Sequence, residues 1–186
     1  MQASVLIVGG GASGLMAALF DARGGARVTL LERNEKLGKK IYITGKGRCN
    51  LTNACDAEAF MRHILRNPRF LYASLATLNN MGLMSLMESL GLPLKTERGE
   101  RVFPASDKAS DVTNTLAREL ERLGVEVKLN ARVASLLCEG GRASGVELEG
   151  GERLTADAVV LATGGLSYPS TGSTGDGLRT AEETGH

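Results

Sequence analysis

The opening of the chain constrains its fold more than any other segment. An apolar run at Val5–Val8 leads directly into Gly9-Gly10-Gly11-Ala12-Ser13-Gly14, and a second apolar run ends at Leu31, followed by Glu32. Strand, Gly-x-Gly-x-x-Gly turn, helix and strand with a closing acid are typical of a Rossmann-like α/β fold that binds a dinucleotide.

Each residue of this motif has a physical reason. Gly9 permits the tight turn, Gly11 lets the backbone approach a pyrophosphate, and Gly14 lets the helix lie close to the sheet. Ala12-Ser13 opens that helix, whose N-terminal N–H groups and positive dipole end favour phosphate. Glu32 is placed to accept hydrogen bonds from ribose hydroxyls. The alternative is a glycine-rich turn that serves packing alone.

Length and composition fit about one globular domain. The chain has 186 residues, 42% of them hydrophobic, and its 22 basic and 21 acidic residues leave a net charge of +1. This balance favours neither a nucleic-acid nor a membrane partner. No apolar stretch is long enough for a transmembrane helix, and the first strand begins without a signal peptide. We therefore expect a cytoplasmic protein.

Cysteine and histidine usage predicts no disulfide framework and no metal site. The three cysteines, Cys49, Cys55 and Cys138, form no CxxC pair, and His63 and His186 are isolated. Cys49 is a candidate redox thiol, although it lacks a resolving partner.

The rest of the chain predicts helices and strands in an order unlike that of a simple NAD-binding domain. Gly124 is the expected C-cap of an amphipathic helix for which Ser106 is the candidate N-cap. Its apolar residues recur at helical spacing, at Val112, Leu116, Leu120 and Leu123. A three-stranded β-meander is expected over Val133–Cys138, Ala143–Glu149 and Glu152–Thr155, with glycine turns at 140–141 and 150–151. The other expected elements are a helix over Ala12–Arg23, a helical stretch over Ala57–Leu90 interrupted at Asn67-Pro68, a hairpin around Gly99, a strand over Val125–Leu129, a buried strand over Ala158–Ala162 and a short helix over Gly175–Thr184.

A second glycine turn, Ala162-Thr163-Gly164-Gly165, follows the buried strand. In the FAD-binding arrangement of this fold the chain makes a second pass beneath the cofactor at such a turn. The first turn, the helical excursion, the meander and this second turn together predict FAD as the cofactor.

Four segments carry a resemblance to a known family: GGGASGLMAA, LLERNEKLGKKIYITGKGRCNLTN, LKTERGERVFPASDKASDV and LATGGLSYPSTGSTGDG. The chain resembles the BaiN/YhiN-like flavoproteins, which include aminoacetone oxidase-type enzymes and belong to the two-dinucleotide-binding-domain flavoproteins. This resemblance implies a GR2-type FAD-binding domain over residues 1–186, with a helical and hairpin excursion at about 55–105. It also implies that a β-rich insertion and a C-terminal return are missing.

The resemblance further implies roles for individual residues. It places Lys40, Thr44, Gly45, Cys49 and Asn50 near the cofactor, in a segment whose basic excess, Arg33 included, would balance phosphate charge. The alternative is a solvated basic loop. Val133 lies where the family recognises adenine through backbone groups. The resemblance places Asp176 beside FAD. From its position at the start of a predicted helix, Asp176 is also a candidate for an ordinary N-cap.

The sequence thus predicts an FAD-dependent oxidoreductase that acts on a small amine, ketone or enone, with NAD(P)H as a candidate electron donor. Arg48 and Tyr168 are candidates for orienting a substrate, and no catalytic residue is assigned. Two alternatives stay open: an RNA-associated flavoprotein and a non-catalytic FAD-binding half.

Overall fold

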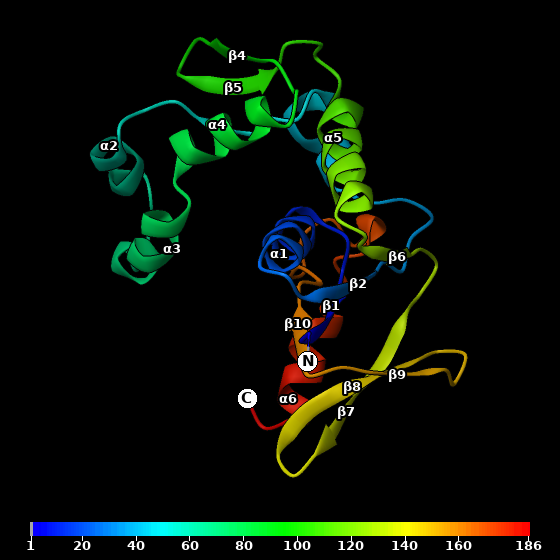
Figure 1. Cartoon of the computed structure of the whole chain (residues 1–186). Helices are drawn as coiled ribbons and strands as arrows, with labels where there is room; N and C mark the ends of the chain where they lie inside the picture. Colours follow the sequence, from blue (N-terminus) through cyan, green and yellow to red (C-terminus); the bar gives the residue numbers. More distant parts are fainter. Residues whose placement is uncertain (1) are drawn as a thin grey trace. The chain divides into compact units, whose positions relative to one another are not determined.

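The structure is a computed structural model that describes residues 2–186, and it contains a four-stranded parallel sheet (Figure 1). The strand order is β10-β1-β2-β6. The strands are β1 (Ser4–Val8), β2 (Arg27–Leu31), β6 (Glu126–Lys128) and β10 (Ala158–Leu161). Parallel strands need a crossover, and α1 (Ala12–Arg23) supplies it between β1 and β2. The expected Rossmann-like α/β fold is confirmed.

The sheet is covered by α1 and by an antiparallel meander, β7 (Val133–Glu139), β8 (Arg142–Leu148) and β9 (Arg153–Thr155). Side chains alternate along a strand, so Leu6 and Val8 of β1 share one face. That face packs against Val146 and Leu148 of β8 in one apolar cluster. The meander was expected from the sequence, and its strands begin and end within a residue or two of the predicted bounds.

The chain divides into two compact units, which we describe separately. The first unit comprises the chain up to Ile41 together with Leu116–His186, and it contains the parallel sheet and the meander. Its last elements are the 3-10 helix η3 (Pro169–Thr171) and α6 (Asp176–Glu183). Helix α5 (Ala109–Arg122) runs from the second unit into the first, and its apolar positions Val112, Leu116 and Leu120 are buried as its periodicity predicted.

The second unit, Tyr42–Thr115, combines short helices with a small antiparallel sheet of order β3-β5-β4. The side chain of Asn80 joins two parts of this unit, because its Nδ2 donates to the carbonyls of Asn53 and Cys55, each at 2.7 Å. The elements are η1 (Ile41–Gly47), β3 (Thr52–Asn53), α2 (Ala57–Arg62), η2 (Pro68–Leu71), α3 (Tyr72–Thr77), α4 (Asn80–Ser89), β4 (Leu94–Glu97) and β5 (Arg101–Pro104).

Four local expectations need correction. The strand expected to be buried, β10, is an edge strand whose residues are exposed or half-buried. The N-cap of α6 is Gly175 and not Asp176, which is the first residue of the helix. The stretch over 57–90 is four short helices, and its break at Asn67 is confirmed by a left-handed φ of +48°. Ser106 is not an N-cap, since α5 begins only at Ala109. The reason is Asp107, whose φ of +59° and ion pairs with Arg48 and Lys95 keep it out of the helix.

Candidate functional site

The first glycine turn is fixed by the protein's own backbone. Gly9 has a φ of +108°, and a Cβ there would lie 2.5 Å from the carbonyl oxygen of Ala162, in the second turn. A Cβ on Gly14 would overlap the carbonyl oxygen of Gly9. A Cβ on Gly10 would lie 2.5 Å from Leu37. Packing alone therefore requires glycine at Gly9 and Gly14, where the obstacle is backbone, whereas at Gly10 the obstacle is the end of a flexible side chain.

Gly11 is different. Its φ of −78° and ψ of −171° are extended values that any L-residue adopts, and a Cβ there would meet no atom of the described residues within 4 Å. Gly165, in the second turn, also has open space at its Cβ position and lies outside the left-handed range. The packing of the described residues gives no reason for glycine at either position. Both follow neighbouring strands, β1 and β10, at the same edge of the sheet.

The start of α1 lies beside this open space. Gly11 is the N-cap residue, and among the described residues no side chain caps the helix. The first turn, which contains Ala12 and Ser13, therefore presents N–H groups that an anion can satisfy. Lys40 comes from a segment held close by, because the N–H of Gly38 donates to the carbonyl of Gly10 at 2.8 Å.

The second turn packs against the start of α6. Gly164 has a φ of +76°, and a Cβ there would lie 2.9 Å from the hydroxyl of Ser173. A Cβ on Gly177 would overlap the hydroxyl of Thr163. Ala162 is tied to β1, since its N–H donates to the carbonyl of Val8 at 2.8 Å.

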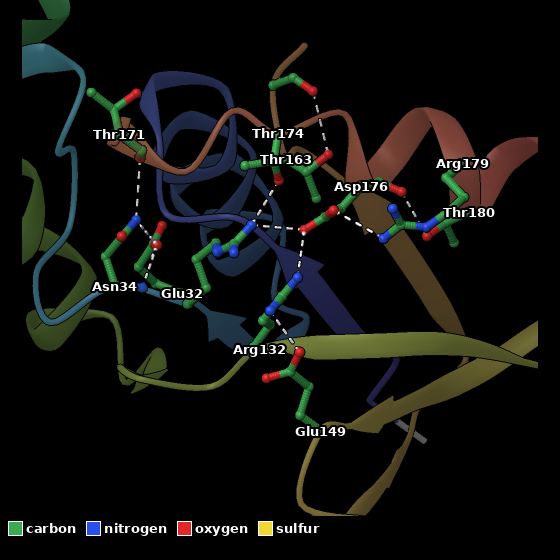
Figure 2. Close-up of polar contacts among 12 residues, drawn as sticks. Glu32, Asn34, Arg132, Glu149, Thr163, Thr171, Thr174, Asp176, Arg179 and Thr180 are labelled. Atoms are coloured by element: carbon green, nitrogen blue, oxygen red, sulfur yellow. Dashed lines mark hydrogen bonds and ion pairs between the residues drawn. The ribbon is translucent and has the colours of Figure 1, made fainter. Parts of the chain in front are cut away.

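Glu32 is buried at the end of β2, with 6% of its surface exposed. Its Oε2 accepts from the N–H of Gly10 at 2.7 Å. Its Oε1 accepts from the N–H and the Nδ2 of Asn34, at 2.8 and 2.6 Å (Figure 2). The carboxylate thus lies directly against the first glycine turn, as a ribose-binding acid must. Nothing in the sequence pattern singled out Asn34.

Arg33 and Asp176, both predicted to lie near the cofactor, are paired with each other at 2.7 Å. Arg179 lies at 2.9 Å and Arg132 at 3.8 Å from the same carboxylate (Figure 2). Burial acts to raise the pKa of Asp176, but hydrogen bonds from Thr174 and Arg179 and the charges of Arg33 and Arg132 hold it below its usual range. Asp176 is therefore ionised at neutral pH.

Arg33, Arg132, Asp176 and Arg179 form a charged cluster. Val133 is the first residue of β7 and immediately follows Arg132 of this cluster. The preceding segment is attached to the end of β2, because the N–H of Ala131 donates to the carbonyl of Glu32 at 2.9 Å. Glu32, Arg33, Val133 and Asp176 come from distant parts of the sequence, and the first unit brings them to one end of its sheet.

The loop from Thr44 to Asn50 belongs to the second unit. Its backbone is unusual, with Lys46 at a φ of +58° and Cys49 at +62°. A Cβ on Gly45 would lie 2.7 Å from the backbone nitrogen of Asn50. Such left-handed non-glycine residues store strain and concentrate at functional sites.

Two side chains of this loop have clear electrostatic surroundings. Burial raises the pKa of the Cys49 thiol, and a hydrogen bond from Thr44 opposes this only in part. The thiol is therefore protonated at neutral pH and a weak nucleophile. Arg48 lies 4.1 Å from the ring centre of Phe103 and pairs with Glu97 at 2.8 Å and Asp107 at 3.2 Å. Its guanidinium is thus engaged within the second unit.

Residues 2–186 contain neither a candidate membrane-spanning helix nor a candidate metal-binding cluster. None of their helices has the length and the apolar character needed to cross a membrane. No group of three or more His, Cys, Asp or Glu side chains in that range could hold a metal ion.

Comparison with known proteins adds to this geometry. The family model described as HI0933-like protein Rossmann domain matches residues 3–186. The 3-dehydro-bile acid delta(4,6)-reductase of Clostridium scindens is 41% identical over 184 residues, which cover 97% of this chain and 43% of that protein. The ribosomal RNA dihydrouridine synthase of Escherichia coli K12 is 29% identical over 97% of this chain and 44% of its own length. This chain spans less than half the length of both relatives.

A solved structure with a similar fold is the open conformation of a flavocytochrome c3 fumarate reductase. It matches with a TM-score of 0.69 and 23% identity, over 99% of this chain and 40% of that one. At this identity the likeness is one of fold.

Proposed function

The chain belongs to the HI0933-like protein Rossmann-domain family of FAD-binding flavoproteins, and from this premise we propose that it binds FAD for an oxidoreductase reaction on a small molecule. The flavin of bound FAD supplies the redox chemistry by accepting and donating a hydride or electrons. The residues of this chain would bind the cofactor, orient it and balance its charge.

One observation carries the proposal: glycine occupies position 11 although no described residue requires it there. In a strand-turn-helix motif with an uncapped helix start, such a glycine leaves room for close approach of a ligand. The uncapped start of α1 makes that ligand an anion, and the pyrophosphate of a dinucleotide has the right charge.

The remaining predicted residues then divide by the part of FAD that they would contact. Gly9, Gly11, Ala12, Ser13 and Gly14 would hold the pyrophosphate, and Glu32 the adenosine ribose. Around the adenosine we place the backbone of Val133 and the side chains of Arg33 and Asp176. For the pyrophosphate, ribityl chain and flavin we propose the second turn and the loop segment, namely Ala162, Thr163, Gly164, Lys40, Thr44, Gly45, Cys49 and Asn50.

For the substrate we propose a ketone or enone, ahead of an amine. The name of the 41%-identical relative, a 3-dehydro-bile acid delta(4,6)-reductase, supports this order. Reduction of such a substrate needs an electron donor, and NAD(P)H is our candidate.

The test of FAD binding compares two glycines that both have open space at the Cβ position. Gly11→Val should weaken FAD binding at least about a hundredfold, since its side chain fills the volume proposed for the pyrophosphate. Gly150→Val, in the turn between β8 and β9, should leave binding unchanged. Titration of purified apoprotein with FAD measures both. Equal affinities for the two variants would refute the proposal, as would recovery of FMN or NAD as the bound cofactor.

A second candidate, reduction of a base in RNA, is favoured by a surface of the second unit. No acidic residue occurs from residue 59 to 87, whereas Arg62, Arg66 and Arg69 all lie there and are exposed. Phe70 and Tyr72 are 84% and 58% exposed in the same segment. Arginines beside exposed aromatic rings suit the phosphates and unstacked bases of single-stranded RNA. The name of the 29%-identical relative supports the same substrate class.

An electrophoretic shift with ribosomal RNA separates the two candidates. If RNA is the substrate, the paired change Arg66→Gln and Arg69→Gln should weaken RNA binding about tenfold or more and reduce its salt dependence. FAD binding should be unaffected. Absence of any shift at low salt would eliminate the RNA candidate and leave the small-molecule one.

A further inference from the structure

Asn34 holds the carboxylate of Glu32 through two separate donors. Its backbone N–H and its side-chain Nδ2 both donate to Oε1, at 2.8 and 2.6 Å. The opposite oxygen, Oε2, accepts from the N–H of Gly10. A carboxylate has roughly four acceptor positions, so these three bonds leave about one direction open to an incoming hydroxyl group. Asn34 thereby fixes where that direction points.

The same amide connects Glu32 to the segment after β10. Nδ2 of Asn34 also reaches the carbonyl of Thr171, at 3.3 Å (Figure 2). Gly172 packs so closely that a Cβ there would lie 2.9 Å from this Nδ2. The neighbouring Arg33 contacts the same part of the chain, because its Nη1 donates to the hydroxyl of Thr174 and to the carboxylate of Asp176. Asn34 thus connects the acid at the end of β2 to the last residue of η3.

We propose that Asn34 is a positioning residue for ribose recognition, acting through Glu32. The proposal rests on the proposed FAD function and deepens it: the acid of the fingerprint binds the ribose only in the orientation that the Asn34 amide imposes. Asn34 itself need not touch the nucleotide.

The variant Asn34→Asp tests this orientation because it replaces the donor at 2.6 Å with a second carboxyl group. Two carboxylates at that distance cannot both be ionised, so the introduced group either carries a proton and donates to Glu32 or repels it. Among the nearby charges, Lys39 has its Nζ 3.4 Å from Oδ1 of Asn34 and pairs with Glu35. The other nearby charges belong to the charged cluster: Arg33, Arg132 and Asp176. The positive charge of Lys39 favours the ionised form of the introduced aspartate, so FAD affinity would recover at a lower pH.

The measurement is the FAD and ADP affinity of each variant between pH 5.5 and 8.5. Asn34→Ala should bind both ligands about five- to tenfold more weakly than the parent, with the parent's pH profile. Asn34→Asp should bind at least as weakly at pH 8.5 and recover by about tenfold at pH 5.5. The matched control is Asn79→Asp, which makes the same atom exchange at the N-cap of α4, where a carboxylate serves as well as an amide, and which should match the parent throughout.

Thermal midpoints of all variants separate weak binding from loss of folding. If Asn34→Asp binds like the parent at pH 8.5, or loses affinity equally at every pH, the positioning role is overturned while FAD binding by the parent stands. A parent that binds neither FAD nor ADP would overturn the proposed function, and this inference with it.

Discussion

The end of the parallel sheet and the loop from Thr44 to Asn50 both hold predicted cofactor residues, yet different forces keep them in shape. At the sheet, Gly9 and Gly14 meet backbone atoms with no room for a Cβ, and Glu32 is buried among hydrogen-bond donors. In the loop, Arg48 pairs with carboxylates on the β4–β5 hairpin and beyond, and these groups are about a third exposed. Close backbone contacts do not respond to salt, whereas partly exposed ion pairs do. Substitutions in the first region should therefore lower the free energy of unfolding, whereas substitutions in the loop should weaken FAD binding without unfolding the protein.

The largest expected effect is that of Gly14→Ala. Its Cβ would overlap the carbonyl oxygen of Gly9, and both atoms belong to a turn that the strands hold fixed. The free energy of unfolding should fall by about 3–5 kcal/mol, measured by chemical denaturation. Gly150→Ala, at an open position, is the control. A small effect of Gly14→Ala would mean that the turn relaxes and that the contrast with the loop is false.

The next largest effect is expected for Glu119→Gln, a substitution in the first unit but outside the charged cluster around Asp176. Hydrogen bonds from Arg122 and Arg23 lower the pKa of the buried Glu119 carboxyl to about 2, against the effect of burial. Because the folded pKa is depressed, the stabilisation is complete above pH 4.5 and disappears as the pH falls toward 2. The change should cost about 2 kcal/mol at neutral pH after allowance for the exposed arginines. Stability curves of parent and variant that run parallel between pH 5 and pH 2 would contradict this.

A smaller effect is expected from Arg48→Met in the loop. The substitution keeps contact with Phe103 but removes both ion pairs, so FAD affinity should fall about three- to tenfold without unfolding. The parent's affinity should fall toward that of the variant at 1 M salt, because salt screens the same pairs. Titrations at low and high salt measure this, with Arg48→Lys as the conservative control. A salt effect of equal size in Arg48→Met would show that the network is not its source.

The smallest effect concerns Cys49→Ser. Because burial raises the pKa of this thiol, it should take no part in electron transfer, and FAD affinity and turnover should change by less than about threefold. Thiol labelling of the parent should modify the exposed Cys138 well before the buried Cys49. Rapid labelling of Cys49, with loss of turnover in Cys49→Ser, would revive the redox-thiol interpretation.

Local sequence rules predicted the elements that depend on neighbouring residues. The period of Val112, Leu116 and Leu120 predicted α5, and the glycines at 140–141 and 150–151 predicted the turns of the meander. The rules failed where distant residues intervene. Ser106 looked like an N-cap until ion pairs from Arg48 and Lys95 held Asp107 in a left-handed conformation.

The candidate site shows the same division. The sequence by itself determined the strand-turn-helix fingerprint, the acid at the end of β2 and the second glycine turn, because each depends on backbone geometry within a few residues. Only the tertiary structure decided that Arg33 pairs with Asp176 and that Asn34 holds Glu32 while reaching Thr171. It also decided which glycines are required by packing and which leave room for a ligand. The Arg33–Asp176 and Asn34–Thr171 contacts join segments more than 130 residues apart, and chain topology, not local propensity, brings these segments together.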